Sequence, residues 1–277
     1  MKVLLVMLGN FQSYIIDNIE YLLKHNNNNI TIITDEKNSN KFENYTQLEI
    51  IEIENIMDSY KKDTKGQNRN FRNGFWFYTS YRFIAIYEYM KKYEIKDIVH
   101  IENDVLVFKN IDTIDFHDKT KILVTMDHLN RCIPGIMFIP NHEILHTCIQ
   151  NFKGPNDMSK WAHCYTTLDC VDSLPIINEI PDTNINKIVS NKFEHYQCIF
   201  DAAAIGQYLG GVDPRNKRGG KGFVNETCVV KFNKYKFIWK DENNISLPYI
   251  IINDKEYPVV NLHVHSKNLK QFIRINP

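Results

Sequence analysis

The chain lacks an excess of either charge. Its 277 residues include 33 Lys and Arg against 33 Asp and Glu, which gives a formal net charge of +0 at pH 7. Nucleic acids and anionic membranes attract proteins through a broad basic surface, and a neutral chain provides no such global field. We therefore expect no nucleic-acid partner, and any anion must be bound by a local cluster of basic residues.

Paired cysteines are absent as well. None of the six cysteines belongs to a Cys-x-x-Cys pair, and their spacing does not resemble a zinc site. In a chain of this length, buried reduced thiols are a commoner use of cysteine than a disulfide framework. The cysteines are therefore expected to be free and buried.

Long apolar runs are also missing. No segment has the roughly 20 consecutive apolar residues that cross a bilayer. The run Met1–Gly9 is short and no small-residue cleavage site follows it, so it predicts a buried strand rather than a signal peptide. We expect a soluble, cytoplasmic protein without a transmembrane segment.

Strand and helix patterns alternate in the N-terminal part of the chain. This βαβ alternation predicts an α/β fold with a mostly parallel central sheet flanked by helices. The expected strands are Lys2–Leu8, Ile30–Thr34, Leu48–Ile53, Ile98–Ile101, Lys121–Met126 and Gly135–Ile139. The expected helices are Ser13–His25, about Gly74–Tyr93, and Phe200–Leu209. The stretch Lys153–Asp182 has no regular pattern, and no repeat or linker divides the chain.

Two carboxylates interrupt an apolar run in the middle of the chain. Glu102 and Asp104 stand between the strand-forming residues Ile98–Ile101 and Val105–Phe108. Two carboxylates two residues apart at a strand end can project toward one divalent cation. Because burying them without a counter-ion would be costly, a positive partner is expected there. The alternative is a solvated strand end, where acidic residues are common.

A second polar cluster lies at Val259–Lys267. In a strand, alternate residues share a face, so Asn261, His263 and His265 are expected to point the same way. Two histidines beside Lys267 suit a metal and a phosphate together, because neutral imidazole is a common ligand and Lys is a compact charge. A pair of hydrogen-bonded core histidines is the alternative.

Two arginines and an aspartate complete the candidates. Arg72 precedes the long predicted helix, and Arg82 lies within it among large apolar residues. An unpaired buried arginine is expensive, so Arg82 is expected to pair with a carboxylate of the 102–104 segment or with a nucleotide phosphate. The alternative is a surface arginine with a buried stem. Asp201 lies at the start of its predicted helix. It is expected to act as the N-cap of that helix, as a catalytic carboxylate, or as both.

These residues occur in an order that resembles a known family. The segment Thr79–Phe83, a helix, and then Asp97–Val107 are similar to the glycogenin and lipooligosaccharide-galactosyltransferase type of nucleotide-sugar glycosyltransferase. The resemblance is strongest over residues 71–108. It extends more loosely to three further places, which are Gly135–Ile139, Asp201 and His263–Lys267.

The resemblance implies a fold and a division of the chain. The fold is GT-A-like (Rossmann-type), in a single domain over residues 1–277 with an elaborated C-terminal half. Residues 1–110 correspond to the nucleotide-binding half. Residues 111–277 correspond to the acceptor-side half and carry the C-terminal metal-binding segment.

The resemblance also implies a metal site for Mn²⁺ or Mg²⁺. Asp104 corresponds to the second aspartate of the family's Asp-x-Asp, a metal ligand, and Glu102 replaces the first, which contacts ribose and metal. His265, or failing that His263, matches the C-terminal histidine that completes the site. Lys267 lies where a lysine touches the diphosphate.

Further roles follow for the donor and for catalysis. Arg82 resembles the helix residue near the donor sugar and is counted, with Asp201, as catalytic. Arg72 is a further expected donor contact. The first strand leads into Leu8-Gly9-Asn10 rather than the family's acidic signature, so Asp35 is the residue expected to read the base.

The implied activity is metal-dependent glycosyl transfer of the hexosyltransferase type. A sugar would move from a nucleoside diphosphate sugar, with UDP-sugar favoured, to a hydroxyl acceptor on a glycan, protein or lipid. The basic stretches Lys61–Arg72 and Arg215–Lys221 are either lids over the donor or plain solvated charge.

Two alternatives stay open. A sugar-phosphate nucleotidyltransferase would be expected to have a glycine-rich loop after the first strand, where this chain has only Gly9-Asn10. A catalytically silent GT-A-like module that binds a glycan or a partner would need none of the acidic, histidine and lysine residues above.

Overall fold

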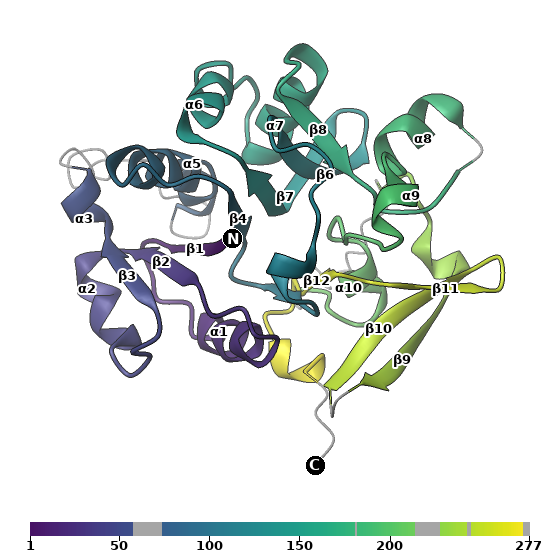
Figure 1. Cartoon of the computed structure of the whole chain (residues 1–277), viewed down its shortest axis with the longest axis horizontal. Helices are drawn as coiled ribbons and strands as arrows, with labels where there is room; N and C mark the ends of the chain where they lie inside the picture. Colours follow the sequence, from purple (N-terminus) through teal and green to yellow (C-terminus); the bar gives the residue numbers. More distant parts are fainter. Residues whose placement is uncertain (58–73, 181, 214–227, 243–244, 274–277) are drawn as a thin grey trace.

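A seven-stranded sheet forms the centre of the molecule (Figure 1). The computed structural model describes residues 1–277 except 58–73, 181, 214–227, 243–244 and 274–277. The sheet has the order β3-β2-β1-β4-β7-β6-β8. Its strands are β1 (Lys2–Met7), β2 (Ile30–Thr34), β3 (Glu49–Glu52), β4 (Ile98–Ile101), β6 (Ile122–His128), β7 (Arg131–Ile139) and β8 (Val171–Leu174).

The sheet is mostly parallel, as the βαβ alternation predicts. Only β7 runs against its neighbours β4 and β6, whereas β1, β2, β3 and β4 are mutually parallel and β8 is parallel to β6. Helices lie on both faces (Figure 1). The described helices are α1 (Tyr14–Lys24), α2 (Glu36–Ser39), α3 (Ile53–Ile56), α5 (Phe75–Lys92), α6 (His142–Gln150), α7 (Asp157–Thr167), α8 (Thr183–Val189), α9 (Phe193–Tyr196) and α10 (Ile205–Tyr208).

The alternation of side chains along β1 explains why both faces are covered. Leu4 and Val6 pack in the core that includes α5, α6 and α7, whereas Leu5 and Met7 pack in the core that includes α1. A strand buried on both faces must be apolar throughout, and residues 3–7 are all fully or almost fully buried. The α/β prediction is confirmed.

The C-terminal half adds two smaller sheets. The strands β9 (Lys236–Glu242), β10 (Ile245–Ile252) and β11 (Lys255–Pro258) form an antiparallel sheet, and β5 (Val105–Val107) pairs with β12 (Asn261–His263). This is the elaborated C-terminal half that was expected. All six cysteines are free thiols, and five of them are buried, as predicted.

Two local predictions were wrong. The helix expected at Phe200–Leu209 contains only Ile205–Tyr208, because residues 200–204 are held by side-chain hydrogen bonds instead. The stretch expected to be irregular contains α7 and β8. Asn156 starts α7 in a reciprocal capping arrangement with Ser159, a short-range signal that the irregular composition concealed.

Among the helices that the described residues form, none has the length and apolar composition needed to span a bilayer.

Asn261 fastens β12 to the loop that precedes α10. It is fully buried, its Oδ1 accepts the Asp201 backbone N–H at 3.1 Å, and its Nδ2 donates to the Asp201 backbone carbonyl at 3.2 Å. We predict that Asn261→Ala lowers the free energy of unfolding by about 1–3 kcal/mol, because two buried backbone groups lose their partner. Urea denaturation measures this loss. Asn268→Ala, at an exposed position of the same segment, should leave stability unchanged.

Candidate active site

The turn between β4 and β5 carries the two central carboxylates. Glu102 and Asp104 follow the buried strand β4, at its carboxyl end, where ligands gather in open α/β sheets. Asn18, fully buried on α1, donates from Nδ2 to the backbone carbonyls of Glu102 and Asn103 at 3.4 and 3.1 Å. The helix after β1 therefore holds this turn in place.

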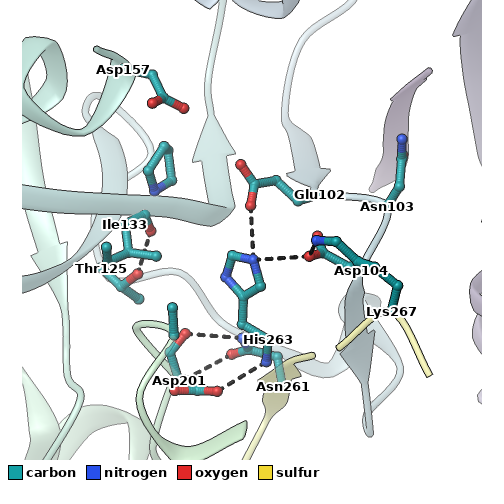
Figure 2. A network of polar contacts seen from close by, with 12 residues as sticks. Glu102, Asn103, Asp104, Thr125, Ile133, Asp157, Asp201, Asn261, His263 and Lys267 are labelled. Atoms are coloured by element: carbon teal, nitrogen blue, oxygen red, sulfur yellow. Dashed lines mark hydrogen bonds and ion pairs between the residues drawn. The ribbon is translucent and has the colours of Figure 1, made fainter. Parts of the chain in front are cut away.

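Pairing of β12 with β5 brings His263 to the same place. The register sets His263 opposite Val105, and the Val264 N–H donates to the Asp104 carbonyl at 2.8 Å. His263 Nε2 lies 3.1 Å from Glu102 Oε2 and 3.4 Å from Asp104 Oδ2 (Figure 2). The potential ligand atoms of these three residues all lie within 4.8 Å of one another.

Two cations flank the acidic groups. Lys267 forms an ion pair with Asp104 Oδ2. Arg82 Nη1 lies 2.5 Å from Glu102 Oε1, and its Nη2 lies 3.1 Å from Asp157 Oδ2. The expectation that Arg82 pairs with a carboxylate of the 102–104 segment is therefore confirmed. Arg82 is 7% exposed, so it is a buried bridge rather than a surface arginine.

The ionisation of these groups follows from their contacts. Burial alone would lower the pKa of His263, but the Asp104 and Glu102 carboxylates outweigh it and raise that pKa to about 10. Burial would raise the pKa of Glu102, but the Arg82 guanidinium and then His263 lower it to about 2. The pKa of Asp104 is held well below its ordinary value, because Lys267 and His263 overcome the effect of burial.

The charged side chains of the cluster have a net negative charge that one more cation would compensate. Glu102, Asp104 and Asp157 carry three negative charges against two positive charges on Arg82 and Lys267. Protonated His263 would fill this deficit, in keeping with the raised pKa of its imidazole. A divalent ion bound to neutral His263 would fill it instead and leave one positive charge in excess, which suits an anionic ligand.

The donor set fits a divalent metal. Two carboxylates from one turn and one imidazole present oxygen and nitrogen atoms to a common point, where they could hold a divalent ion such as Mn²⁺ or Mg²⁺. The imidazole ring is held from behind, because a Cβ added at Gly135 would lie only 2.9 Å from His263 Nδ1. Among the residues that the structure describes, none hydrogen-bonds to that buried Nδ1, so packing against Gly135, the backbone and the Nε2 contacts to the two carboxylates place the ring.

His265 does not belong to this group of ligand atoms. Strand β12 ends at His263, two residues before His265, so the alternation that was expected to align the two histidines does not reach His265. The His265 ring instead lies edge-on to the His263 ring, with centroids 4.5 Å apart. Burial, with the charge of His263, lowers the pKa of His265 to about 3 and keeps it neutral. Among the described residues it is His263, the second choice of the sequence analysis, that offers a ligand atom near Glu102 and Asp104, and the metal role of either histidine stays a prediction.

Asp201 holds backbone rather than facing a ligand. It is 1% exposed, and Figure 2 shows its carboxylate beneath His263. Oδ1 accepts the N–H groups of Ala204 and Ile205 at 2.8 Å, and Oδ2 accepts those of Gly206 and His263 at 2.9 Å. These four donors occupy the oxygens that a general base would need, so the geometry favours a positioning role, and the catalytic role stays an untested prediction.

The structure describes Asp35 but not Arg72. Asp35 is 5% exposed, and its Oδ2 accepts the Gly9 N–H at 2.5 Å. It therefore fixes the turn after β1, and its expected contact with a base stays a prediction. Arg72 lies outside the described residues, as do the basic stretches Lys61–Arg72 and Arg215–Lys221.

A cavity of about 500 Å³ opens above the cluster. One wall comes from the β1–α1 connection and the start of α5, where Phe11, Phe75 and Trp76 supply aromatic rings. Residues of β7 and α7, with Gln207 of α10, line the cavity as well. Glu102, Asp104, His263, His265, Lys267 and Arg82 all line this cavity. The structure thus brings together every metal and phosphate candidate that it describes, whereas Asp35 and Asp201 are not among the lining residues.

Sequence reasoning missed Asp157 and Asn18. Asp157 stands in the first turn of α7, inside the stretch that was expected to be irregular. Asn18 occupies a buried position of the apolar face of α1. A buried amide on a helix face that is otherwise apolar was the available signal, because such a group needs partners.

We predict that the protein binds one Mn²⁺ ion and that Asp104→Asn weakens this binding by more than tenfold, because a charged ligand becomes a neutral amide. Isothermal titration with Mn²⁺ measures the affinity. Glu256→Gln, on the exposed strand β11, should bind Mn²⁺ as the unaltered protein does. Equal affinities for the two variants would mean that the ion binds elsewhere.

A second prediction concerns Asp201. Asp201→Asn should lower the free energy of unfolding by about 1–3 kcal/mol and weaken Mn²⁺ binding, since one oxygen that accepts backbone N–H groups becomes a donor. Asp182→Asn is the matched control, because its carboxylate caps α8 at an exposed position far from the cluster. If Asp201→Asn left stability and metal binding intact and abolished only turnover, Asp201 would be the catalytic residue after all.

No protein-family model and no curated protein matches the sequence. Among solved structures, the chain is similar to the glycosyltransferase GlyE of Streptococcus pneumoniae TIGR4, with 12% identity and a TM-score of 0.43 over 62% of this chain and 45% of that one. It is also similar to mouse xyloside xylosyltransferase 1, with 11% identity and a TM-score of 0.43 over 70% of this chain and 92% of that one.

A cytidylyltransferase from Leptospira borgpetersenii serovar Hardjo-bovis is similar as well, with 12% identity and a TM-score of 0.37 over 66% of this chain and 78% of that one. The match spans less than half of GlyE. At such low identities and TM-scores, the function has to be argued from the site's own residues.

Proposed function

We propose that the protein is a metal-dependent glycosyltransferase. It moves a sugar from a nucleoside diphosphate sugar, with UDP-sugar favoured, to a hydroxyl of a glycan, protein or lipid acceptor. The observation that carries the proposal is the meeting of Glu102, Asp104 and His263 within 4.8 Å beneath a cavity of about 500 Å³. A cavity of that size fits a ligand of several rings.

The ion would supply Lewis-acid neutralisation of the diphosphate leaving group. The protein's own residues prepare for the same charge. Lys267, whose side chain is 31% exposed at the cavity, can turn from Asp104 to a phosphate oxygen. A cation fixed beside a departing diphosphate stabilises the negative charge that accumulates there as the glycosidic bond breaks.

Arg82 acts mainly on Glu102. Its guanidinium bridges Glu102 and Asp157 while 8% of its side chain is exposed, so it holds one carboxylate oxygen in place and leaves the other to face His263. Because Arg82 also lines the cavity, it can contact the donor sugar as the resemblance implies. This contact is part of the proposal.

The aromatic rim favours a carbohydrate acceptor. Phe75 and Trp76 each expose 38% of their surface at the start of α5 and line the mouth of the cavity. The apolar face of an aromatic ring can pack against a sugar ring, and aromatic rings exposed to solvent commonly mark a binding site. A glycan, or a glycan carried by a protein or lipid, is therefore the favoured acceptor.

A test of the proposal is release of UDP from UDP-sugars in the presence of Mn²⁺. We predict slow release that stops on chelation with EDTA. In Asp104→Asn the rate of UDP release should fall by more than ~100-fold. Loss of a residue that only hydrogen-bonds to a metal ligand costs up to about that much, and Asp104 is proposed to bind the metal directly. Coupled detection of UDP measures the rate. Glu256→Gln should keep the unaltered rate.

The same assay separates the alternatives. A sugar-phosphate nucleotidyltransferase would release pyrophosphate from a nucleoside triphosphate and a sugar phosphate, and would leave UDP-sugars intact. A silent binding module would bind Mn²⁺–UDP without turnover of any donor. Either result would contradict the proposed transfer.

A further inference from the structure

Three cysteine side chains gather in the core that α6 and α7 share. Cys148 lies in the last turn of α6, Cys164 lies on α7, and Cys170 lies between α7 and β8. The Sγ atoms of Cys148 and Cys170 are 3.9 Å apart, and Cys164 Sγ donates to the Cys148 backbone carbonyl at 3.4 Å. None of these three residues lines the cavity above the metal cluster. The group of thiols is therefore separate from the candidate active site.

The backbone holds Cys148 and Cys170 beside each other. Cys148 belongs to a helix, and the Cys170 carbonyl accepts the Ile122 N–H of β6 at 2.9 Å. A disulfide needs its two sulfur atoms at about 2.0 Å, so about 2 Å of approach remains. Rotation of the two side chains about their Cα–Cβ bonds can cover that distance. Cys164 is the less suited partner, because its thiol donates to the carbonyl of Cys148.

The three thiols differ in their access to solvent. Cys148 and Cys164 are fully buried, whereas Cys170 is partly exposed, so an oxidant from solvent meets Cys170 first. The neighbouring Cys164 thiol, and then burial, raise the pKa of the Cys148 thiol well above its ordinary value. These surroundings disfavour a thiolate at Cys148. They accept a disulfide, because a disulfide carries no charge.

We propose that Cys148 and Cys170 are an oxidation site, which forms an intramolecular disulfide when the protein meets a low-molecular-weight disulfide. The Cys170 thiolate attacks one sulfur of the small molecule, forms a mixed disulfide with it and releases one small thiolate. Cys148 then loses its proton and attacks Cys170 Sγ, which forms the Cys148–Cys170 bond and releases the second small thiolate. The protons of the two cysteines end on the two small thiols. Two protein thiols are thus oxidised and one small disulfide is reduced.

The bond would fasten the end of α6 to the start of β8, the strand at one end of the sheet. A cross-link between residues 22 positions apart restricts the unfolded chain and so stabilises the folded protein. The whole of α7 lies inside the closed loop, and its first residue, Asp157, binds Arg82. The disulfide would therefore stabilise the helix that supports the metal cluster without entering the cavity.

The experiment treats the full chain with oxidised glutathione, removes the excess and counts the free thiols after denaturation. The count of six should fall by two, and dithiothreitol should restore it. Cleavage before aspartates and after glutamates cuts at Asp157, Asp169 and Glu143, which leaves Cys148 and Cys170 on separate peptides without another cysteine. Mass spectrometry of the unreduced digest then identifies the linked pair. The melting temperature of the oxidised protein should rise by about 5 °C.

Two variants check the assignment. Cys164→Ala should still form the disulfide and lose two thiols on oxidation, whereas Cys170→Ser should form none. The inference is overturned if the thiol count of the unaltered protein does not change, or if glutathione stays on Cys170 without a Cys148–Cys170 peptide. It is also overturned if the linked peptides join Cys148 to Cys164. A Cys148–Cys170 bond that leaves the melting temperature unchanged would contradict the stabilising role. The peptides of the unaltered protein decide between these results even if a variant fails to fold.

Discussion

The short antiparallel pairing of β5 with β12 is the interaction on which the site depends. It joins residues 105–107 to residues 261–263 and sets His263 between Glu102 and Asp104. Asp201 reinforces this pairing, because one of its carboxylate oxygens accepts the N–H of His263 and the N–H of Gly206. Without this pairing, two carboxylates at the end of β4 would be buried with too few positive partners, and their burial would be costly.

Electrostatic balance then explains why these residues lie together. Arg82 and Lys267 compensate only part of the charge of Glu102, Asp104 and Asp157, and a protonated His263 supplies the rest. A cluster with one uncompensated negative charge favours the binding of a metal ion. With a divalent ion bound, the cluster would carry a net positive charge, which favours the binding of a diphosphate. The fold and the proposed chemistry therefore follow from the same balance of charges.

Much of the fold could be predicted from local pattern. The βαβ alternation defined β1, α1, β2 and β3, because buried parallel strands and amphipathic helices have clear periodicities. The conformation of the chain around Asp201 could not be predicted in this way. Its carboxylate accepts four backbone N–H groups, and one of them belongs to His263, which is distant in sequence. Asp157 was missed for a related reason. The capping signal at Asn156 is short, and irregular composition surrounds it.

The candidate site was predicted in part. Glu102, Asp104, His263, Lys267 and Arg82 do converge, because strand ends and turn chemistry bring them to one edge of the sheet. The choice between His263 and His265 depended on the residue at which β12 ends, and strand boundaries are weakly encoded in sequence. The position of Asn18 depended on tertiary hydrogen bonds that no periodicity reveals.

The most direct test of this account is the anomalous scattering of Mn²⁺ in crystals of the protein grown with the ion. The account predicts one peak within coordination distance of a Glu102 oxygen, an Asp104 oxygen and Nε2 of His263. A peak that is not shared by these three side chains, or no peak at saturating Mn²⁺, would contradict it.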